Sequence, residues 1–342
     1  MRRSRIRVDL GAIRRNAARL REAAGPAELW AVVKADGYGH GAVGASRAAL
    51  GGGATALCVA TVREGEQLRE AFPSARILVM SPLARGEEPV ARDARLEVVL
   101  TSPEAPDGLA VHLKVDTGMG RWGMSLGEAL TVPRERVVGV MSHLATADEA
   151  DEAFAREQVE RFREIAAAFP GVTAHLANSA GALRLPEARF DAVRCGVALY
   201  GLSPFGDDPA AHGLEPALGW RSYVALVREL DTGESTGYGR RFVAERPARV
   251  GIVPVGYADG FRRGLTGTEV LVDGARRRVV GTISMDAFAV ELEGEQAGVE
   301  VTLIGDGILA EDHARVLGTI NYELTCGLNR DPTRADRSVV DG

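Results

Sequence analysis

The stretch "LWAVVKADGYGHGA", Leu29–Ala42, runs from apolar residues into a lysine and then into a turn. Lys34 ends the apolar run, and Tyr38 stands between Gly37 and Gly39. A nearly continuous apolar run is typical of a parallel strand that is covered on both faces. Glycines allow the chain to turn tightly directly after such a strand. The stretch therefore predicts a buried parallel strand with an amine at its carboxyl end.

Seven further runs rich in Val, Ile, Leu and Ala follow, and polar-striped or Ala-rich segments separate them. They are ATALCVAT (54–61), RILVMS (76–81), LEVVL (96–100), AVHLKVD (110–116), VVGVMSH (137–143), VTAHLAN (172–178) and AVRCGVA (192–198). Eight strands that alternate with helices predict an α/β fold, a (β/α)8 TIM barrel. The clearest helix is expected at Asp148–Phe169. The connection 101–109 holds two prolines and leaves no room for a full helix.

The pattern changes after Gly213. Antiparallel strands joined by Gly-containing turns are expected in 221–230, 248–258, 268–274, 276–293 and 299–307, with one helix in 308–320. The segment 203–216 is rich in Pro, Gly and Asp, as a domain boundary would be. We therefore expect a barrel domain at 1–213 and a mostly antiparallel β domain at 214–342.

Composition excludes several classes of protein. The chain has 342 residues, 46% hydrophobic content and a net charge of −6, with basic residues dispersed among acidic ones. Three scattered cysteines (Cys58, Cys195 and Cys326) form neither a disulfide framework nor a zinc site. No stretch approaches 18 uncharged apolar residues, and the basic N-terminus lacks a following apolar region. We expect a cytoplasmic protein with no metal, no nucleic-acid partner and no membrane partner.

Unusual polar residues cluster where the predicted strands end, and active sites of such barrels lie at that rim. They are Lys34, KVDTGMGRWG (114–123), His143, ANSAG (177–181) and RCGVALYG (194–201). Loops after the seventh and eighth strands of these barrels commonly bind phosphate. A lysine amine in apolar surroundings loses hydration, which favours the neutral form that attacks an aldehyde. Pyridoxal 5′-phosphate (PLP) carries both an aldehyde and a phosphate, so the rim predicts PLP.

Each of these residues also has a structural alternative. Lys34 could reach solvent while Tyr38 simply packs. Arg194 could pair with Asp191 or a neighbouring acid, and Lys114 could pair with Asp116. His143 could be a core histidine, Arg121 could stack on Trp122, Tyr257 could be an ordinary turn residue, and Met285 could fill the core. His112, His175 and His313 are interpreted as structural.

The motifs resemble those of the alanine racemase family. VVKADGYGHG, KVDTGMGRWG, SHLATAD, HLANSAG, RCGVALYG, GYG (237–239), VPVGYADGF, GTISMD and NYE occur in the family's order and near its spacing, over nearly the whole chain. The resemblance implies a PLP-bearing barrel followed by a β domain. It also implies a homodimer whose active sites are shared between subunits.

Roles follow from the resemblance residue by residue. Lys34 would bind PLP and act as one base, and Tyr238 of the other subunit would be the second. The phosphate of the cofactor would be held by Tyr38, Ser179, Gly196 and Val197, with Asn178 beside them. Arg194 would face the pyridine nitrogen of the cofactor, and His143 would hydrogen-bond Arg194. The substrate would meet Arg121, Tyr257, Met285 and Asp286. Lys114 matches a lysine that is often carbamylated in relatives.

Arg194 distinguishes between reactions. Arginine cannot accept a proton from the pyridine ring nitrogen, so the cofactor would withdraw electrons less strongly. That favours a racemase over a PLP-dependent decarboxylase of the same fold, which would want an acid there. We expect interconversion of L- and D-alanine that supplies D-alanine for peptidoglycan; a broad-specificity or serine racemase is the alternative. Ser284 and Arg330 depart from common family residues, and Arg330 leaves the entrance, and hence substrate range, open.

Overall fold

The computed structural model describes residues 3–342, which divide into two compact units. One unit holds residues 12–205 and 209–215, and the other holds residues 3–11, 206–208 and 216–342. The predicted division at residue 213 stays a prediction, but strand pairing places the first strand in the second unit. Within residues 3–342, no helix combines the length and apolarity needed to cross a membrane.

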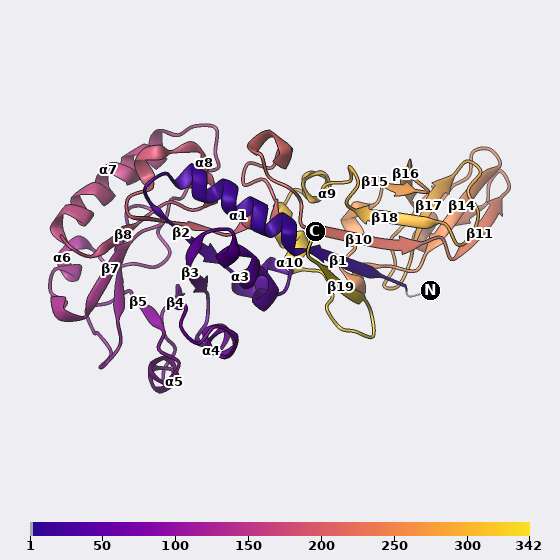
Figure 1. The fold of residues 1–342 in the computed structure, drawn as a ribbon. Helices are drawn as coiled ribbons and strands as arrows, with labels where there is room; N and C mark the ends of the chain where they lie inside the picture. Colours follow the sequence, from indigo (N-terminus) through magenta and orange to yellow (C-terminus); the bar gives the residue numbers. More distant parts are fainter. Residues whose placement is uncertain (1–2) are drawn as a thin grey trace. The chain divides into compact units, whose positions relative to one another are not determined.

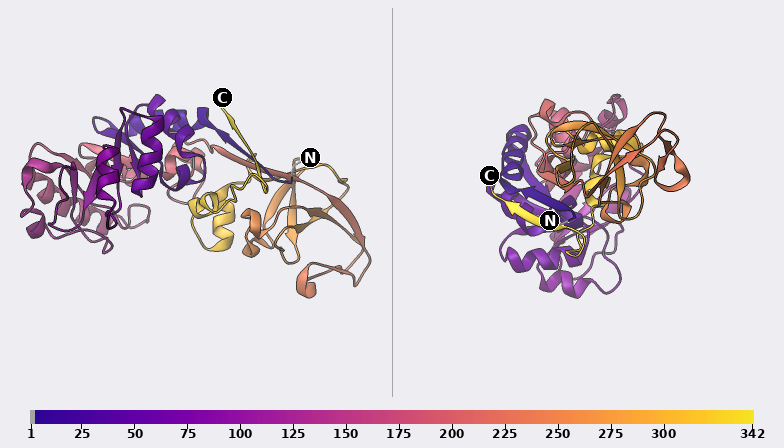
Figure 2. Two further views of the ribbon diagram at one scale, coloured as in Figure 1. Left: turned by 90° about the horizontal axis from the view of Figure 1, so that it is seen from below. Right: turned by 90° about the vertical axis from the view of Figure 1, so that its right-hand side faces the viewer.

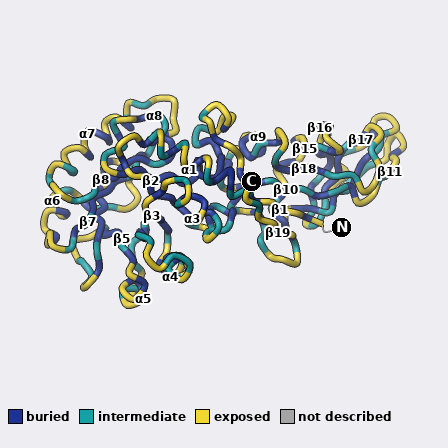
Figure 3. Tube along the Cα trace, viewed as in Figure 1, coloured by how far each residue is buried: buried dark blue, intermediate teal, exposed yellow. Residues whose placement is uncertain are grey.

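The first unit is a closed barrel of eight parallel strands, which confirms the predicted fold class. The strands are β2 (Glu28–Val32), β3 (Ala54–Val59), β4 (Arg76–Val79), β5 (Glu97–Leu100), β6 (Val111–Lys114), β7 (Val137–Met141), β8 (Thr173–His175) and β9 (Ala192–Cys195). The helical segments are α1 (Leu10–Ala24), α2 (Lys34–Tyr38), α3 (Ala42–Gly51), α4 (Val62–Ala71), α5 (Glu88–Asp93), α6 (Leu126–Ala129), α7 (Ala153–Ala168) and α8 (Ser179–Arg184). Figure 1 shows the longer helices outside the strands, and Figure 3 shows the strands largely buried.

Two local expectations can be compared with the barrel. The connection after β5 contains no helix, as its prolines predicted. Helix α7 begins at Ala153, five residues later than expected, because Asp151 Oδ1 instead accepts the Ala153 N–H at 2.9 Å. An acidic side chain that bonds the backbone favours a turn before the helix rather than a further helical turn.

Strand register places a set of polar side chains among the buried interior residues. Arg194 is the register partner of Trp30, and Met141 is the partner of both Lys114 and His175. Trp30 and Met141 belong to the buried cluster of the barrel, together with Val32, Ala56, Cys58, Leu78, Val99 and Ala192. Because register partners in parallel strands share a face, the charged and imidazole groups enter the barrel interior.

The second unit is a nine-stranded sheet that is antiparallel except for one pair. Its order is β11-β14-β17-β16-β15-β18-β10-β1-β19. The strands are β1 (Arg5–Asp9), β10 (Leu218–Tyr223), β11 (Leu226–Leu230), β14 (Ala248–Val253), β15 (Glu269–Val272), β16 (Ala275–Val280), β17 (Phe288–Leu292), β18 (Glu300–Ile304) and β19 (Asp336–Val340). A short ribbon of β12 (Ser235–Thr236) with β13 (Phe242–Val243), and helices α9 (Ala310–Leu317) and α10 (Asn321–Cys326), complete it.

Strands β1 and β19 were not expected from the sequence. Ile6 and Val8 are buried while Arg5 and Arg7 are exposed, so β1 does carry the period-two pattern of a strand. It pairs antiparallel with β10 and parallel with β19, and Figure 2 shows these first and last strands of the chain beside one another. The pairing joins segments about 330 residues apart, which no local pattern could predict.

Candidate active site

A left-handed turn follows β2 and carries the lysine. Ala35, Asp36 and Tyr38 have φ of 52°, and Gly37 has φ of 63°. For residues other than glycine this conformation costs roughly 1–2 kcal/mol each, so the surroundings must hold it. Asp36 contributes locally, since its Oδ1 accepts the Ala42 N–H at 2.8 Å. The turn places the Nζ of Lys34 6.0 Å from the centroid of the Tyr38 ring.

Tyr38 reaches from this turn to the loop after β9. A Cβ built on Gly196 would lie 2.5 Å from the Tyr38 hydroxyl, so only glycine fits there. Ser179 Oγ accepts the Gly196 N–H at 3.0 Å. The next segment is a 3-10 helix that begins at Val197. Four predicted phosphate-binding residues are therefore brought together at one end of the barrel.

Asn178 has a different part in this arrangement. Its Oδ1 accepts the Gly181 N–H at 2.9 Å and caps the short helix that begins at Ser179. The side-chain oxygen is therefore engaged by the backbone, and Asn178 fixes the orientation of the neighbouring Ser179.

Arg194 is buried, and its guanidinium is surrounded by acceptors. Nη1 donates to His175 Nδ1 at 2.8 Å and to the His175 carbonyl at 2.7 Å. Nη2 donates to the carbonyls of Ser142 (2.7 Å) and Leu176 (3.0 Å) and lies 3.4 Å from His143 Nδ1. Asp191, the alternative partner, instead accepts the Ala174 N–H. Burial lowers the pKa of Arg194 to about 10.

A chain of hydrogen bonds continues from Arg194 below the rim. Because a guanidinium only donates, His175 Nδ1 must accept, and its Nε2–H donates to His112 Nδ1 at 2.8 Å. His112 Nε2–H then donates to Glu97 Oε2 at 2.9 Å. Arg76 closes the chain by binding the same carboxylate at 2.7 Å. With one tautomer at each histidine, every group in the chain makes its hydrogen bonds.

The titration behaviour agrees with neutral imidazoles. Burial, followed by the Arg194 charge, holds the pKa of both His143 and His175 well below the usual range. Burial also lowers the pKa of His112. Burial acts to raise the pKa of Glu97, but the His112 hydrogen bond and the Arg76 charge outweigh it and lower that pKa.

Lys34 and Lys114 are the two lysines of the entire sequence. Burial, then the charges of Arg194, Arg121 and Lys34, lowers the pKa of Lys114 to about 8. Its Nζ lies 5.6 Å from the Trp122 ring centroid, and the Arg121 guanidinium carbon lies 5.5 Å from the same ring. The contact of Arg121 with Trp122, which was the structural alternative for Arg121, is thus present, and both cations lie near the same ring.

Asp116 shapes the loop that carries Arg121. Its carboxylate accepts the N–H groups of Gly118 (2.9 Å), Met119 (2.9 Å) and Gly120 (3.0 Å). A Cβ on Gly123 would lie 2.7 Å from the Asp116 nitrogen, so the loop closes tightly on itself. The Asp116 carboxylate therefore fixes the backbone of the loop 116–123. The alternative interpretation had paired it with Lys114.

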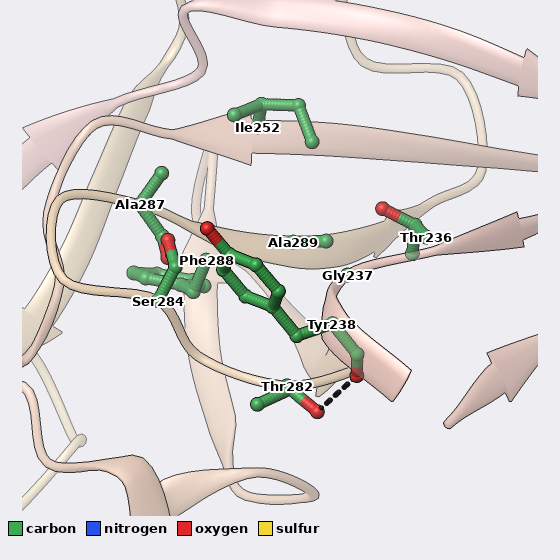
Figure 4. A pocket seen from close by; sticks show the side chains of 9 residues that line it. All are labelled: Thr236, Gly237, Tyr238, Ile252, Thr282, Ser284, Ala287, Phe288 and Ala289. Carbon is green, nitrogen blue, oxygen red and sulfur yellow. Dashed lines mark hydrogen bonds between the residues drawn. The ribbon is translucent and has the colours of Figure 1, made fainter. Parts of the chain in front are cut away.

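In the sheet unit, Tyr238 lines a pocket of about 400 Å3 (Figure 4). Thr236, Ile252, Thr282, Ser284 and Phe288 share it. Thr282 Oγ1 donates to the Tyr238 carbonyl at 2.8 Å, which anchors the backbone while 74% of the tyrosine stays exposed. An exposed aromatic residue with an anchored backbone is suited to meeting another molecule.

The other residues predicted to meet the substrate lie in two joined loops of the same unit. The N–H groups of Tyr257 and Ala258 donate to the Ser284 and Met285 carbonyls, each at 3.1 Å. Gly256 permits this approach, since a Cβ there would lie 2.3 Å from the Met285 carbonyl oxygen. Tyr257 and Met285 are 43% and 52% exposed, so neither fills the core. Asp286 Oδ1 accepts from Arg334 at 2.8 Å.

Comparison with known proteins decides the family. Residues 8–204 match the model "Alanine racemase, N-terminal domain", and residues 217–336 match "Alanine racemase, C-terminal domain". The chain belongs to the alanine racemase family. It is 40% identical to the alanine racemase of Symbiobacterium thermophilum, over 94% of both chains. It is also 40% identical to alanine racemase 1 of Bacillus subtilis, over 94% of this chain and 90% of that one.

Solved structures of alanine racemases have the same fold. That of the Streptomyces coelicolor enzyme matches with a TM-score of 0.92 at 38% identity, over 99% of this chain and 98% of that one. The Bartonella henselae alanine racemase, described with covalently bound pyridoxal phosphate, matches with a TM-score of 0.90 at 27% identity. That match covers 99% of this chain and all of that one.

Within this alanine racemase fold, the sequence interpretation missed the importance of two histidines. His112 and His175 were interpreted as structural, but they connect Arg194 to Glu97. The sequence did indicate this position for His112, because His112 lies two residues before Lys114 on one strand and so shares its face. His143, the predicted partner of Arg194, is the more distant imidazole at 3.4 Å. His313 lies in the sheet unit and donates to the Leu303 carbonyl, as a structural histidine would.

Proposed function

We propose that this chain is a PLP-dependent racemase that interconverts L- and D-alanine. The contact between the Tyr38 hydroxyl and Gly196 carries the proposal, because it joins the turn after Lys34 to the loop after β9. The lysine that would bind the aldehyde of PLP and the groups that would hold its phosphate would thereby share one end of the barrel. The reaction would supply D-alanine for peptidoglycan in the cytoplasm.

The residues present fit PLP. Gly196 leaves room beside Tyr38 and Ser179 that any side chain would fill, and these groups with Val197 and the Asn178 turn would hold the phosphate. Lys34 would hold the aldehyde carbon. Arg194 would face the ring nitrogen as a donor, and His143 and His175 would fix its guanidinium.

When bound, PLP supplies an electron sink that acidifies the α-proton of the amino acid. The chain would provide two groups that move this proton. The Lys34 amine would serve one face of the substrate and the Tyr238 hydroxyl the other, as inversion requires. Arg121, held by the Asp116 loop, would bind the carboxylate, and Tyr257, Met285 and Asp286 would line the substrate side.

We also propose a homodimer, and the exposure of three residues supports it. Tyr238, Tyr257 and Met285 are exposed apolar residues of the sheet unit, and such clusters mark interaction surfaces. We assign them to the active site of a second copy of the chain. A mixture of Lys34→Ala and Tyr238→Phe subunits would then form some intact sites and regain activity that neither variant has alone.

Lys114 is proposed to carry a carbamate. With a pKa lowered to about 8, a part of its amine is neutral near neutral pH and can attack CO2, losing a proton as the C–N bond forms. The resulting anion would lie beside Arg121 and Arg194, whose charges oppose the lysine ammonium.

Incubation with PLP and each member of a panel of L-amino acids tests the activity. Chiral chromatography should detect D-alanine from L-alanine as the fastest conversion. Faster D-serine formation would identify a serine racemase, release of CO2 would identify a decarboxylase, and no D-alanine at any pH would refute the proposal.

A further inference from the structure

The left-handed turn after Lys34 is held by a carboxylate from another βα unit. Glu64 Oε1 accepts the Ala35 N–H at 2.7 Å, across 29 residues of sequence. Ala35 is the residue directly after Lys34. Its φ of 52° is disfavoured for an L-residue, so contacts outside the turn must help to select this conformation.

The second oxygen of Glu64 binds the end of β3. Oε2 accepts the Ala60 N–H at 2.8 Å and the Thr61 N–H at 3.1 Å. The Thr61 hydroxyl in turn accepts the Glu64 N–H at 3.3 Å, which forms the capping box of α4. One carboxylate thus bridges a helix start and the lysine turn.

Capping alone does not account for this geometry. A capping box uses one bond from the glutamate back to the N-cap backbone, and Oε2 already makes it. The bond from Oε1 to Ala35 is additional and leads out of the helix. It ties the turn to a strand that adjoins β2 in the barrel, where Leu57 and Cys58 pair with Ala31 and Val32.

We propose that Glu64 is a positioning residue for Lys34 and Tyr38. The inference rests on the proposed PLP site, because the turn carries one residue for each end of the cofactor. Rotation of the turn would move the Lys34 amine and would also withdraw the Tyr38 hydroxyl from Gly196. The Glu64 carboxylate prevents this by fixing the first N–H of the turn to the neighbouring strand.

Thr61→Ala is the control for Glu64→Ala. Each variant breaks the capping box, but only Glu64→Ala also releases the Ala35 and Ala60 N–H groups. PLP is removed from the three proteins, and its rebinding is titrated by absorbance. Loss of a charge-assisted bond should raise the PLP dissociation constant of Glu64→Ala by about tenfold or more, and that of Thr61→Ala by less than about twofold. Glu64→Gln, with one carbonyl oxygen for two roles, should fall between them.

Hydrogen exchange in the PLP-free proteins gives a second measurement that does not depend on catalysis. Amides of residues 35–41 should exchange faster in Glu64→Ala than in Thr61→Ala, while both speed exchange at the start of α4. Equal PLP binding and equal exchange in the two variants would overturn the proposal and leave Glu64 as a helix cap. Wild-type protein that neither binds PLP nor forms D-alanine would instead refute the proposed function. Hydrogen exchange would still test whether Glu64 fixes the turn after Lys34.

Discussion

Arg194 Nη1 lies 2.8 Å from His175 Nδ1, and this bond begins a chain that ends at the Glu97 carboxylate. Because each member donates toward Glu97, the imidazoles stay neutral and Arg194 keeps its proton. A donor that cannot give up its proton therefore has a fixed orientation at the centre of the barrel. This chain of hydrogen bonds predicts how the charge of Glu97 affects the stability of the barrel unit.

Glu97→Gln should lower the free energy of unfolding by about 1–3 kcal/mol at pH 7, because Arg76 loses its charged partner. The folded state lowers the pKa of Glu97, so its stabilisation is present above the unfolded value and is lost as pH falls through the folded value. Urea unfolding curves at a series of pH values test this. The difference in unfolding free energy between wild type and variant should shrink as the pH falls below about 4.5.

Glu66→Gln serves as the control for this charge change. Glu66 pairs with Arg63 on an exposed helix face, where such pairs contribute less than about 1 kcal/mol. Equal losses of unfolding free energy in the two variants would contradict a stabilising role for the buried hydrogen-bond chain. So would a difference between wild type and Glu97→Gln that grows as the pH falls.

Gly196→Ala should weaken PLP binding by about tenfold or more, because its Cβ would lie 2.5 Å from the Tyr38 hydroxyl and 2.9 Å from the ring carbon that bears it. Gly294→Ala, where a Cβ meets no atom within 4 Å, is the control and should bind PLP normally. Titration of PLP-free protein measures both. Unchanged binding by Gly196→Ala would place the phosphate elsewhere.

Tyr238→Phe should slow racemisation by about 10²- to 10⁴-fold through loss of one proton-transfer group. Lys34 would remain able to remove the α-proton of one alanine enantiomer. Proton NMR in D2O should therefore show exchange of that enantiomer without inversion. Tyr223→Phe, on β10 of the sheet unit, is the control. Full racemisation by Tyr238→Phe would exclude the tyrosine as a base.

Lys114 should give a carbamate signal in 13C NMR after addition of labelled CO2. At fixed dissolved CO2 the signal should grow as pH rises through about 8, since the neutral amine is the reactive form. Lys114→Met removes the signal if the assignment is correct. A signal that persists in this variant would belong to another amine.

The sequence predicted the parts of the site that strand order controls. Eight apolar runs predicted that Lys34, Lys114 and Arg194 lie toward the same end of the barrel, because parallel strands end on the same side. The left-handed turn was not predictable in the same way. The glycines of Gly37–Gly41 indicate a tight turn, but Ala35 and Asp36 adopt their conformation through contacts such as that with Glu64.

Non-local pairing accounts for the remaining differences. Strand β1 was missed because its partner β19 lies at the other end of the chain. His175 was interpreted as structural because its partners His112 and Arg194 lie on two other strands. In both cases the residue pattern was present, but the partners lie on other strands, and only the assembled sheets bring them together.

Borohydride trapping tests the central claim most directly, since the chain has only two lysines, Lys34 and Lys114. Protein loaded with PLP is reduced and digested, and its peptides are analysed by mass spectrometry. The account predicts a phosphopyridoxyl group on the peptide that contains Lys34, and loss of that group in Lys34→Ala. Modification of the Lys114 peptide in its place would contradict the account.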